Sequence, residues 1–110
     1  MRGCLKKLYI GETAAEQEGK IRRAIARGRS LPGLYLITFA SNGQDQLDIL
    51  SAHFLRKKSV REQLPPIVGF GFGQEETMAL IPRMARDAFL ATGTCSLREY
   101  LLSIQPGDEA

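Results

Sequence analysis

Two apolar runs that contain no charged residue most constrain what this chain can fold into. Residues 34–40 read Leu-Tyr-Leu-Ile-Thr-Phe-Ala, and residues 67–72 read Ile-Val-Gly-Phe-Gly-Phe. Runs of this length with few polar interruptions are typical of strands that are covered on both faces. Amphipathic segments precede and follow them, so we expect two central strands of one sheet with helices packed over it.

The other elements follow from hydrophobic spacing, capping residues and breakers. In chain order we predict a strand at 8–10, a helix at 13–28, a strand at 34–40, a turn at 41–45, a strand at 47–50, a helix at 52–63, a strand at 67–72, a helix at 74–92 and a short helix at 97–104. This order, β-α-β-β-α-β-α-α, predicts an α/β fold. We expect a three-layer sandwich around a small mixed, mostly parallel four-stranded sheet, in which only the third strand is antiparallel, at an edge.

Three local patterns refine these elements. Thr13–Glu16 and Ser96–Glu99 both match the capping box of a helix start. Pro82 lies inside the predicted helix at 74–92, where it cannot donate to the Met78 carbonyl and is expected to kink the helix axis. Alternation in the last strand predicts one face with Val68, Phe70 and Phe72 and an opposite face with Ile67, Gly69 and Gly71, against which a helix can lie close.

The length of 110 residues fits one domain, which we place at 1–105 with a mobile tail at 106–110. The longest uncharged stretch, 30–44, contains proline and glycine and falls short of the roughly 20 apolar residues of a membrane span. We therefore expect no membrane association. The first ten residues lack the apolar core and cleavage site of a secretory signal, so the expected location is the cytoplasm.

Glycines at the end of the last predicted strand form the sharpest motif for ligand binding. Gly69, Gly71 and Gly73 stand between a strand and a helix, where backbone amides can hold a phosphate. The dinucleotide fingerprint needs glycine where this chain has Gln74, and Glu75 and Glu76 at the helix start repel anions. No Walker lysine is present. Close helix packing is therefore the favoured interpretation, and a nucleotide-binding enzyme that uses this loop is an alternative.

Other catalytic chemistry has little support in the sequence. His53 is the single histidine, and a pairing with Cys4 or Cys95 would have no recognised motif around it. The two cysteines are expected to be free thiols, because they show neither disulfide density nor zinc spacing. Asp48 and Glu12 are conceivable magnesium ligands, but isolated acids of this kind are usually solvated or paired with a surface cation. We expect no metal and no cofactor.

Positive charge is concentrated in the first part of the chain and gives the best functional lead. Residues 1–61 hold twelve Lys and Arg against five Asp and Glu, whereas residues 62–110 hold three against seven. Two segments free of acids, 20–29 and 56–61, supply the predicted basic patch: Lys20, Arg23, Arg27, Arg56, Lys57, Lys58 and Arg61. Such groups neutralise phosphates and other anions. Ordinary solvated helix faces are the competing interpretation, since no aromatic residues stand among the charges.

Four segments carry a resemblance to a known family: Tyr35–Phe39, Leu47–Leu50, Leu64–Gly69 and Leu97–Leu101. Together they resemble a family of small uncharacterised proteins from anaerobic Gram-positive bacteria. The resemblance covers most of the chain and implies a single domain. The four segments are structural, and no activity or functional residue is carried over from the family.

These observations favour a non-enzymatic binding or regulatory module that uses a basic surface to bind a protein or another anionic partner. A nucleic-acid-binding accessory protein is the first alternative, because phosphates fit the same charges. Self-association through an uncovered edge strand at 47–50 is a further prediction.

Overall fold

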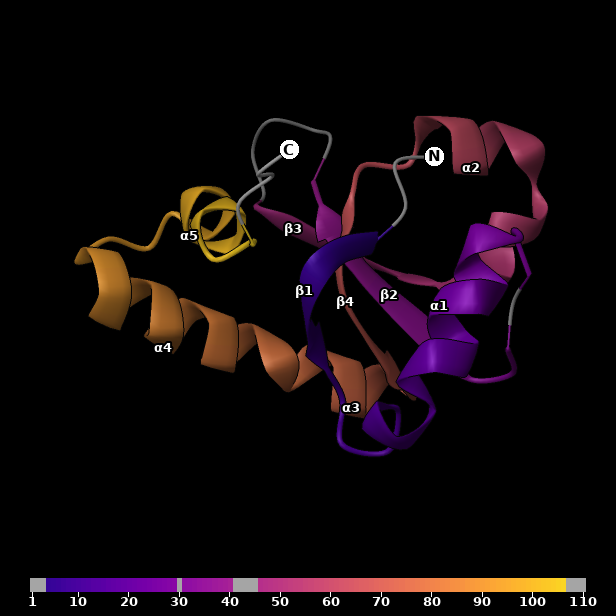
Figure 1. The fold of residues 1–110 in the computed structure, drawn as a ribbon, viewed down its shortest axis with the longest axis horizontal. Helices are drawn as coiled ribbons and strands as arrows, with labels where there is room; N and C mark the ends of the chain where they lie inside the picture. Colours follow the sequence, from indigo (N-terminus) through magenta and orange to yellow (C-terminus); the bar gives the residue numbers. More distant parts are fainter. Residues whose placement is uncertain (1–3, 30, 41–45, 107–110) are drawn as a thin grey trace.

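A four-stranded mixed sheet forms the centre of the computed structural model, which describes residues 4–29, 31–40 and 46–106 (Figure 1). The strands are β1 (Cys4–Ile10), β2 (Leu34–Phe39), β3 (Leu47–Ser51) and β4 (Ile67–Phe72). They lie in the order β1-β4-β2-β3. The two uncharged runs are thus the two central strands, and the predicted α/β fold with a four-stranded mixed sheet is confirmed.

The prediction of a mostly parallel sheet is wrong. β1 and β4 run parallel, but β2 is antiparallel to both of its neighbours, β4 and β3. β3 does lie at an edge and is antiparallel to β2, as expected. The error has a physical cause, because the burial pattern of a covered strand is the same whichever way the strand runs. A helix between two strands therefore suggested a parallel crossover that β1 and β2 do not make.

Apolar side chains fill both faces of the sheet, since successive residues of a strand point to opposite sides. Leu34 and Leu36 of β2 belong to one buried cluster, and Ile37 and Phe39 belong to another. The first helix and the segment after β3 cover the first cluster with Ala14, Ile21, Ile25, Ala52 and Leu55. The last two helices cover the second with Leu80, Met84, Ala88, Leu97, Tyr100 and Leu101.

A bulge in β4 changes which residues share a face. Ile37 pairs with Gly69 and Thr38 pairs with Ile67, so one step along β2 matches two steps along β4 and Val68 is the extra residue. As a result Val68 lies in the second cluster while Phe70 lies in the first. The predicted common face of Val68, Phe70 and Phe72 is therefore wrong, because strict alternation does not survive a bulge.

Seven helical segments connect and follow the strands in the described chain. Two are 3-10 helices, η1 (Ala15–Gln17) and η2 (Ala52–Arg56). The others are α1 (Glu18–Ala26), α2 (Lys58–Gln63), α3 (Gln74–Met78), α4 (Leu80–Thr92) and α5 (Leu97–Ser103). Each predicted helix exists, but those at 13–28 and 52–63 begin with a 3-10 turn, and that at 74–92 is divided. The division is at Ala79, so Pro82 lies in the first turn of α4, where a missing amide costs no helical bond.

The predicted capping boxes are not formed. The residues before η1 and α5 make no side-chain cap bond. The Thr13 amide and hydroxyl instead donate to Oε1 of Glu76, at 3.2 Å and 2.7 Å, and the Leu97 amide donates to Oε1 of Gln46 at 2.6 Å. Residues distant in sequence therefore satisfy these helix starts, which a local motif cannot reveal.

The described residues surround this one sheet, and the radius of gyration is 13.4 Å, near the value of about 13 Å for a packed chain of this length. Within the described ranges no helix has the length and apolar character needed to cross a bilayer. The predicted turn at 41–45 and, apart from Pro106, the predicted tail at 106–110 lie outside the described residues.

Candidate anion-binding surface

The two basic segments meet beside Gly28, at the end of α1. Gly28 has a positive φ of 69°, which ends the helix and favours glycine. A methyl group at this position would lie 2.7 Å from Cδ of Arg61. Nη1 of Arg61 continues past the glycine and donates to the Leu55 carbonyl at 2.7 Å. The absent side chain of Gly28 therefore lets an arginine of α2 pass against the end of α1.

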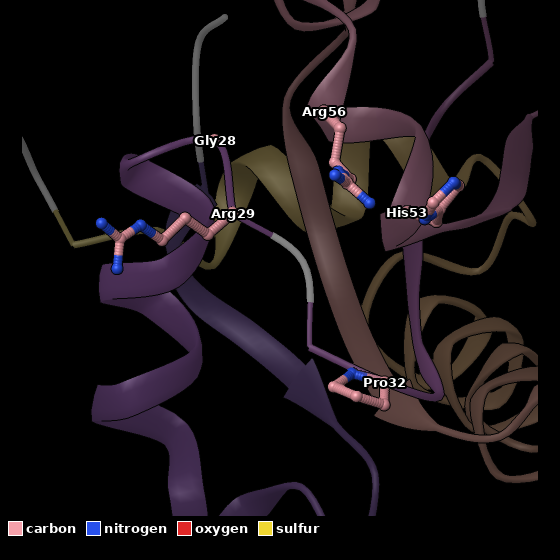
Figure 2. Close-up of a pocket in the computed structure, with 5 residues that line it drawn as sticks. All are labelled: Gly28, Arg29, Pro32, His53 and Arg56. Carbon is pink, nitrogen blue, oxygen red and sulfur yellow. The ribbon is translucent and has the colours of Figure 1, made fainter.

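A pocket of about 500 Å³ opens at this junction, lined by Gly28, Arg29, Pro32, His53 and Arg56. Figure 2 shows Arg56 and His53 on η2, whereas the Arg29 side chain extends over α1, away from them. His53 is positioned by Ser51, whose hydroxyl accepts from the His53 amide at 3.2 Å and caps η2. None of the five lining residues is acidic.

A second groove continues the same surface along α1. It has a volume of about 370 Å³, and Arg29 lines both this groove and the first pocket. We use the term basic surface for the cationic residues that line the two hollows: Lys20, Arg23, Arg27, Arg29 and Arg56. Within the described residues, no ion pair joins any of the five to an acid. Their charges are therefore available to an anion from solution.

The predicted basic residues divide into three groups. Lys20, Arg23, Arg27 and Arg56 are exposed and belong to the basic surface. Lys57 and Lys58 are exposed but do not line either hollow, and Nζ of Lys58 lies 3.9 Å from the Glu62 carboxylate. Arg61 is half-buried and serves the structural contact at Gly28.

Two residues that line this junction are not among the residues of the predicted basic patch. Arg29 lies in the basic segment at 20–29, but only the folded structure shows that it lines both hollows. His53 lines the pocket with Arg56, three residues further along the chain. The signal that could have indicated the junction is the glycine between Arg27 and Arg29, which interrupts the charges where the helix ends.

The two glycines of β4 and the glycine between β4 and α3 serve close packing. A methyl group at Gly69 would lie 2.6 Å from the Tyr9 carbonyl oxygen and 3.3 Å from Cε of Met84 in α4. One at Gly71 would lie 2.8 Å from Oγ1 of Thr77. The amide of Gly73 donates to the Gly33 carbonyl at 2.7 Å. These contacts use the space and an amide that a bound phosphate would need.

The carboxylate of Glu76 is the anion that this loop holds. It accepts from the Phe72 amide at 2.9 Å and from the Thr13 amide at 3.2 Å, in addition to the Thr13 hydroxyl. Desolvation raises the pKa of Glu76, but the hydrogen bonds from Thr13, Phe72 and Ala14 together outweigh it, so the pKa is below its usual value. Glu76 therefore ties the loop after β1 to the end of β4.

A polar network joins three elements on the face of the sheet that α4 and α5 cover. The Tyr9 hydroxyl of β1 donates to Oδ2 of Asp87 in α4 at 2.5 Å, and it lies 3.2 Å from the Tyr100 hydroxyl of α5. The Arg83 guanidinium lies 5.8 Å from the centre of the Tyr9 ring. Desolvation first, and then the bonds to Asp87 and Tyr100, raise the pKa of Tyr9. The hydroxyl thus stays protonated as a donor that holds α4 and α5 on β1.

The remaining candidate residues have separate surroundings. Cys4 is half-buried, and its pKa is raised by desolvation, lowered by Arg22 and raised by Glu18. Cys95 is exposed. Asp48 lies on β3 and lines a groove between β3 and α2. Among the residues at 4–29, 31–40 and 46–106, no three His, Cys, Asp or Glu side chains gather as metal ligands would.

The fold and the basic surface together define a small α/β protein with a mixed four-stranded sheet and a cationic junction between two helical segments. Comparison of the chain with protein families, with curated proteins and with solved structures found no match.

Proposed function

We propose that this chain is a binding module whose basic surface binds an anionic partner. The single observation that carries the proposal is the meeting of the two basic segments beside Gly28, around a pocket whose described lining residues include two arginines and a histidine and no acid. If the two basic segments were only separate solvated helix faces, they would not be expected to line one pocket together. The charges are exposed and unpaired within the described chain, so a partner does not have to displace an internal carboxylate.

Electrostatics and geometry favour binding over catalysis at this surface. Guanidinium groups recognise phosphates and carboxylates through paired donors, and a cationic groove increases the local concentration of anions. The β4–α3 loop offers no comparable place, because the Glu76 carboxylate already accepts its amide. The enzyme alternative based on Gly69, Gly71 and Gly73 is therefore the weaker proposal.

Three further expectations belong with this proposal. Helices over both faces of the sheet support the three-layer architecture predicted from the sequence. The cytoplasmic location and the resemblance to small proteins of anaerobic Gram-positive bacteria, both expected from the sequence, remain expectations beside this proposal. Self-association through the edge strand β3, which the sequence also predicts, is the weaker expectation, because Asp48 in that strand opposes the pairing of two copies.

The experiment compares three anionic probes: inorganic tripolyphosphate, a polyglutamate peptide and a random single-stranded oligonucleotide. Arg29→Gln combined with Arg56→Gln should weaken binding of the best probe about tenfold at low salt, because two unpaired charges of the basic surface are lost. Lys7→Gln combined with Arg86→Gln is the matched control, because it removes the same charge from two exposed side chains outside the basic surface.

Each outcome distinguishes the candidate functions. Affinity for several anions that decreases as salt increases and depends on Arg29 and Arg56 supports the proposal. Binding restricted to the oligonucleotide supports the nucleic-acid alternative. Equal weakening by both pairs of substitutions, or no binding of any probe at low salt, would rule out the basic surface as the binding site.

A further inference from the structure

We propose that the free edge of β3, with the groove between β3 and α2, binds an extended peptide segment of another protein as a fifth strand. The peptide would carry a basic residue and an apolar residue two positions apart. This surface is independent of the basic surface. Three features of the molecule support it: the exposed edge, the groove beside it and the charge within it.

The edge of β3 presents backbone groups to an added strand. The Ala40 amide donates to the Gln46 carbonyl at 3.1 Å, which continues the ladder between β2 and β3. Because alternate residues bond across an antiparallel pair, Asp48 and Leu50 bond inward to β2, whereas Leu47 and Ile49 direct their amides and carbonyls to the edge. No hydrogen bond to these outward groups of Leu47 and Ile49 is found within the described ranges.

An open groove of about 370 Å³ runs beside this edge. Its apolar lining includes Leu50 of β3, Val60 of α2, and Leu64 and Pro65 that follow α2. Ile49 also lines the groove, although its side chain packs into the cluster on the other face of the sheet. Ile49 therefore lines the groove with backbone atoms, and it is one of the two residues whose backbone groups point to the edge. An edge strand with a helix-flanked groove is the arrangement in which proteins bind peptides by strand addition.

Asp48 indicates the chemistry of the occupant. Its carboxylate lines the groove, on the same face of β3 as Leu50, and makes no ion pair within the described residues. A strand added to β3 would place two of its own side chains, two positions apart, opposite Asp48 and Leu50. A cation opposite Asp48 and an apolar side chain opposite Leu50 complement both positions.

A second copy of this chain fits the groove less well. If two copies paired antiparallel about Ile49, Asp48 of one would lie opposite Leu50 of the other. Each carboxylate would then face an apolar side chain without a cation. A charged residue in an edge strand commonly prevents such self-pairing. The charge of Asp48 therefore favours a different, basic peptide.

The test uses an end-capped, fluorescein-labelled octapeptide of threonines that carries one lysine and one leucine two positions apart. The unmodified chain should bind it, with amide chemical-shift changes at Leu47 and Ile49. Asp48→Lys should weaken binding about five- to tenfold, because a favourable cross-strand pair becomes a repulsive one. A second peptide with glutamate in place of lysine should bind the Asp48→Lys variant better than it binds the unmodified chain.

Two matched variants separate the charge of Asp48 from the net charge of the chain and from the shape of the side chain. Glu99→Lys makes the same change of charge on the exposed face of α5 and should leave binding unchanged. Asp48→Asn, which preserves shape, should give an intermediate loss. The proposal is overturned if the lysine peptide does not bind, if Glu99→Lys weakens binding equally, or if the charge-exchanged pair shows no recovery. Sedimentation tests for the other occupant. If it detects a dimer that Asp48→Lys disrupts and that the peptide does not disrupt, a second copy of the chain occupies the groove instead.

Discussion

At the scale of single residues, Glu76 and Gly69 show how one position can join distant parts of the chain. The Glu76 carboxylate accepts hydrogen bonds from residues 13 and 72, and Gly69 lets the Tyr9 carbonyl of a neighbouring strand approach closely. Other residues depend on both positions for their hydrogen bonds or their packing. A substitution at either position should therefore lower the stability of the fold.

Glu76→Gln should lower the free energy of unfolding by about 1–2 kcal/mol at neutral pH, because a neutral amide accepts more weakly than a carboxylate. The folded-state pKa is below the unfolded value, so this stabilisation is complete above the unfolded pKa of about 4.3. It is lost as the pH falls through the folded-state pKa. Urea unfolding of both proteins between pH 7 and pH 3 measures the difference. The exposed neighbour Glu75→Gln is the control, and a difference that does not change with pH would contradict the prediction.

Gly69→Ala should destabilise the fold by about 1–3 kcal/mol, as overpacking of a core does. The added methyl group would meet the Tyr9 carbonyl oxygen, which belongs to the backbone and cannot turn aside. Gly19→Ala is the matched control, because Gly19 is exposed in α1 and alanine is the better helix former. Urea midpoints that fall for Gly69→Ala and stay equal or rise for Gly19→Ala would agree with this contact.

At the scale of elements, the segment at 74–92 illustrates the difference between a helical pattern and a continuous helix. Thr77, Met84 and Ala88 of this segment are buried, as expected for the covered side of an amphipathic helix. The helix is nevertheless divided at Ala79, so that the proline is the third residue of α4. A proline in a first turn replaces no helical bond, whereas one in a helix interior costs about 3 kcal/mol.

Pro82→Ala should therefore change the free energy of unfolding by less than about 1 kcal/mol. The new amide can donate to the Met78 carbonyl, but the unfolded chain regains freedom that proline removes, and the two effects oppose each other. Far-UV circular dichroism should show a small gain in the total helix content, which is the gain expected if α3 and α4 join. Stabilisation by about 3 kcal/mol would mean that the proline interrupts a helix interior.

At the scale of the whole molecule, side chains bind backbone amides and carbonyls at one edge of the sheet, where no neighbouring strand pairs with them. β1 is an edge strand, yet Gln105 accepts from its Lys7 amide at 2.8 Å and donates to its Lys7 carbonyl at 3.1 Å. Arg22 donates to the Leu5 and Lys6 carbonyls of the same strand. At the other edge β3 retains outward groups without a partner in the described chain. This asymmetry is why the inferred peptide site lies at β3.

The Tyr9 network makes a further prediction at this scale, because it connects β1, α4 and α5. Tyr9→Phe should lower the free energy of unfolding by about 1–2 kcal/mol, since Asp87 loses a donor and Tyr100 loses a partner. The raised pKa of Tyr9 means that its stabilisation is complete below the unfolded value of about 10 and declines as the pH rises above it. Urea unfolding at pH 7 and pH 10.5 should show a smaller difference between the proteins at the higher pH. A constant difference would contradict this origin.

The sequence by itself determined the covered strands, the helical segments and the two groups of cations, because burial and helix spacing are recorded in the pattern of neighbouring residues. Only the tertiary structure decided the direction of β2, the bulge at Val68 and the long-range caps from Glu76 and Gln46. It also decided that the two basic segments meet at Gly28, since a surface depends on which elements lie side by side. The physical reason is the same in each case: hydrogen bonds and contacts between distant residues have no local period.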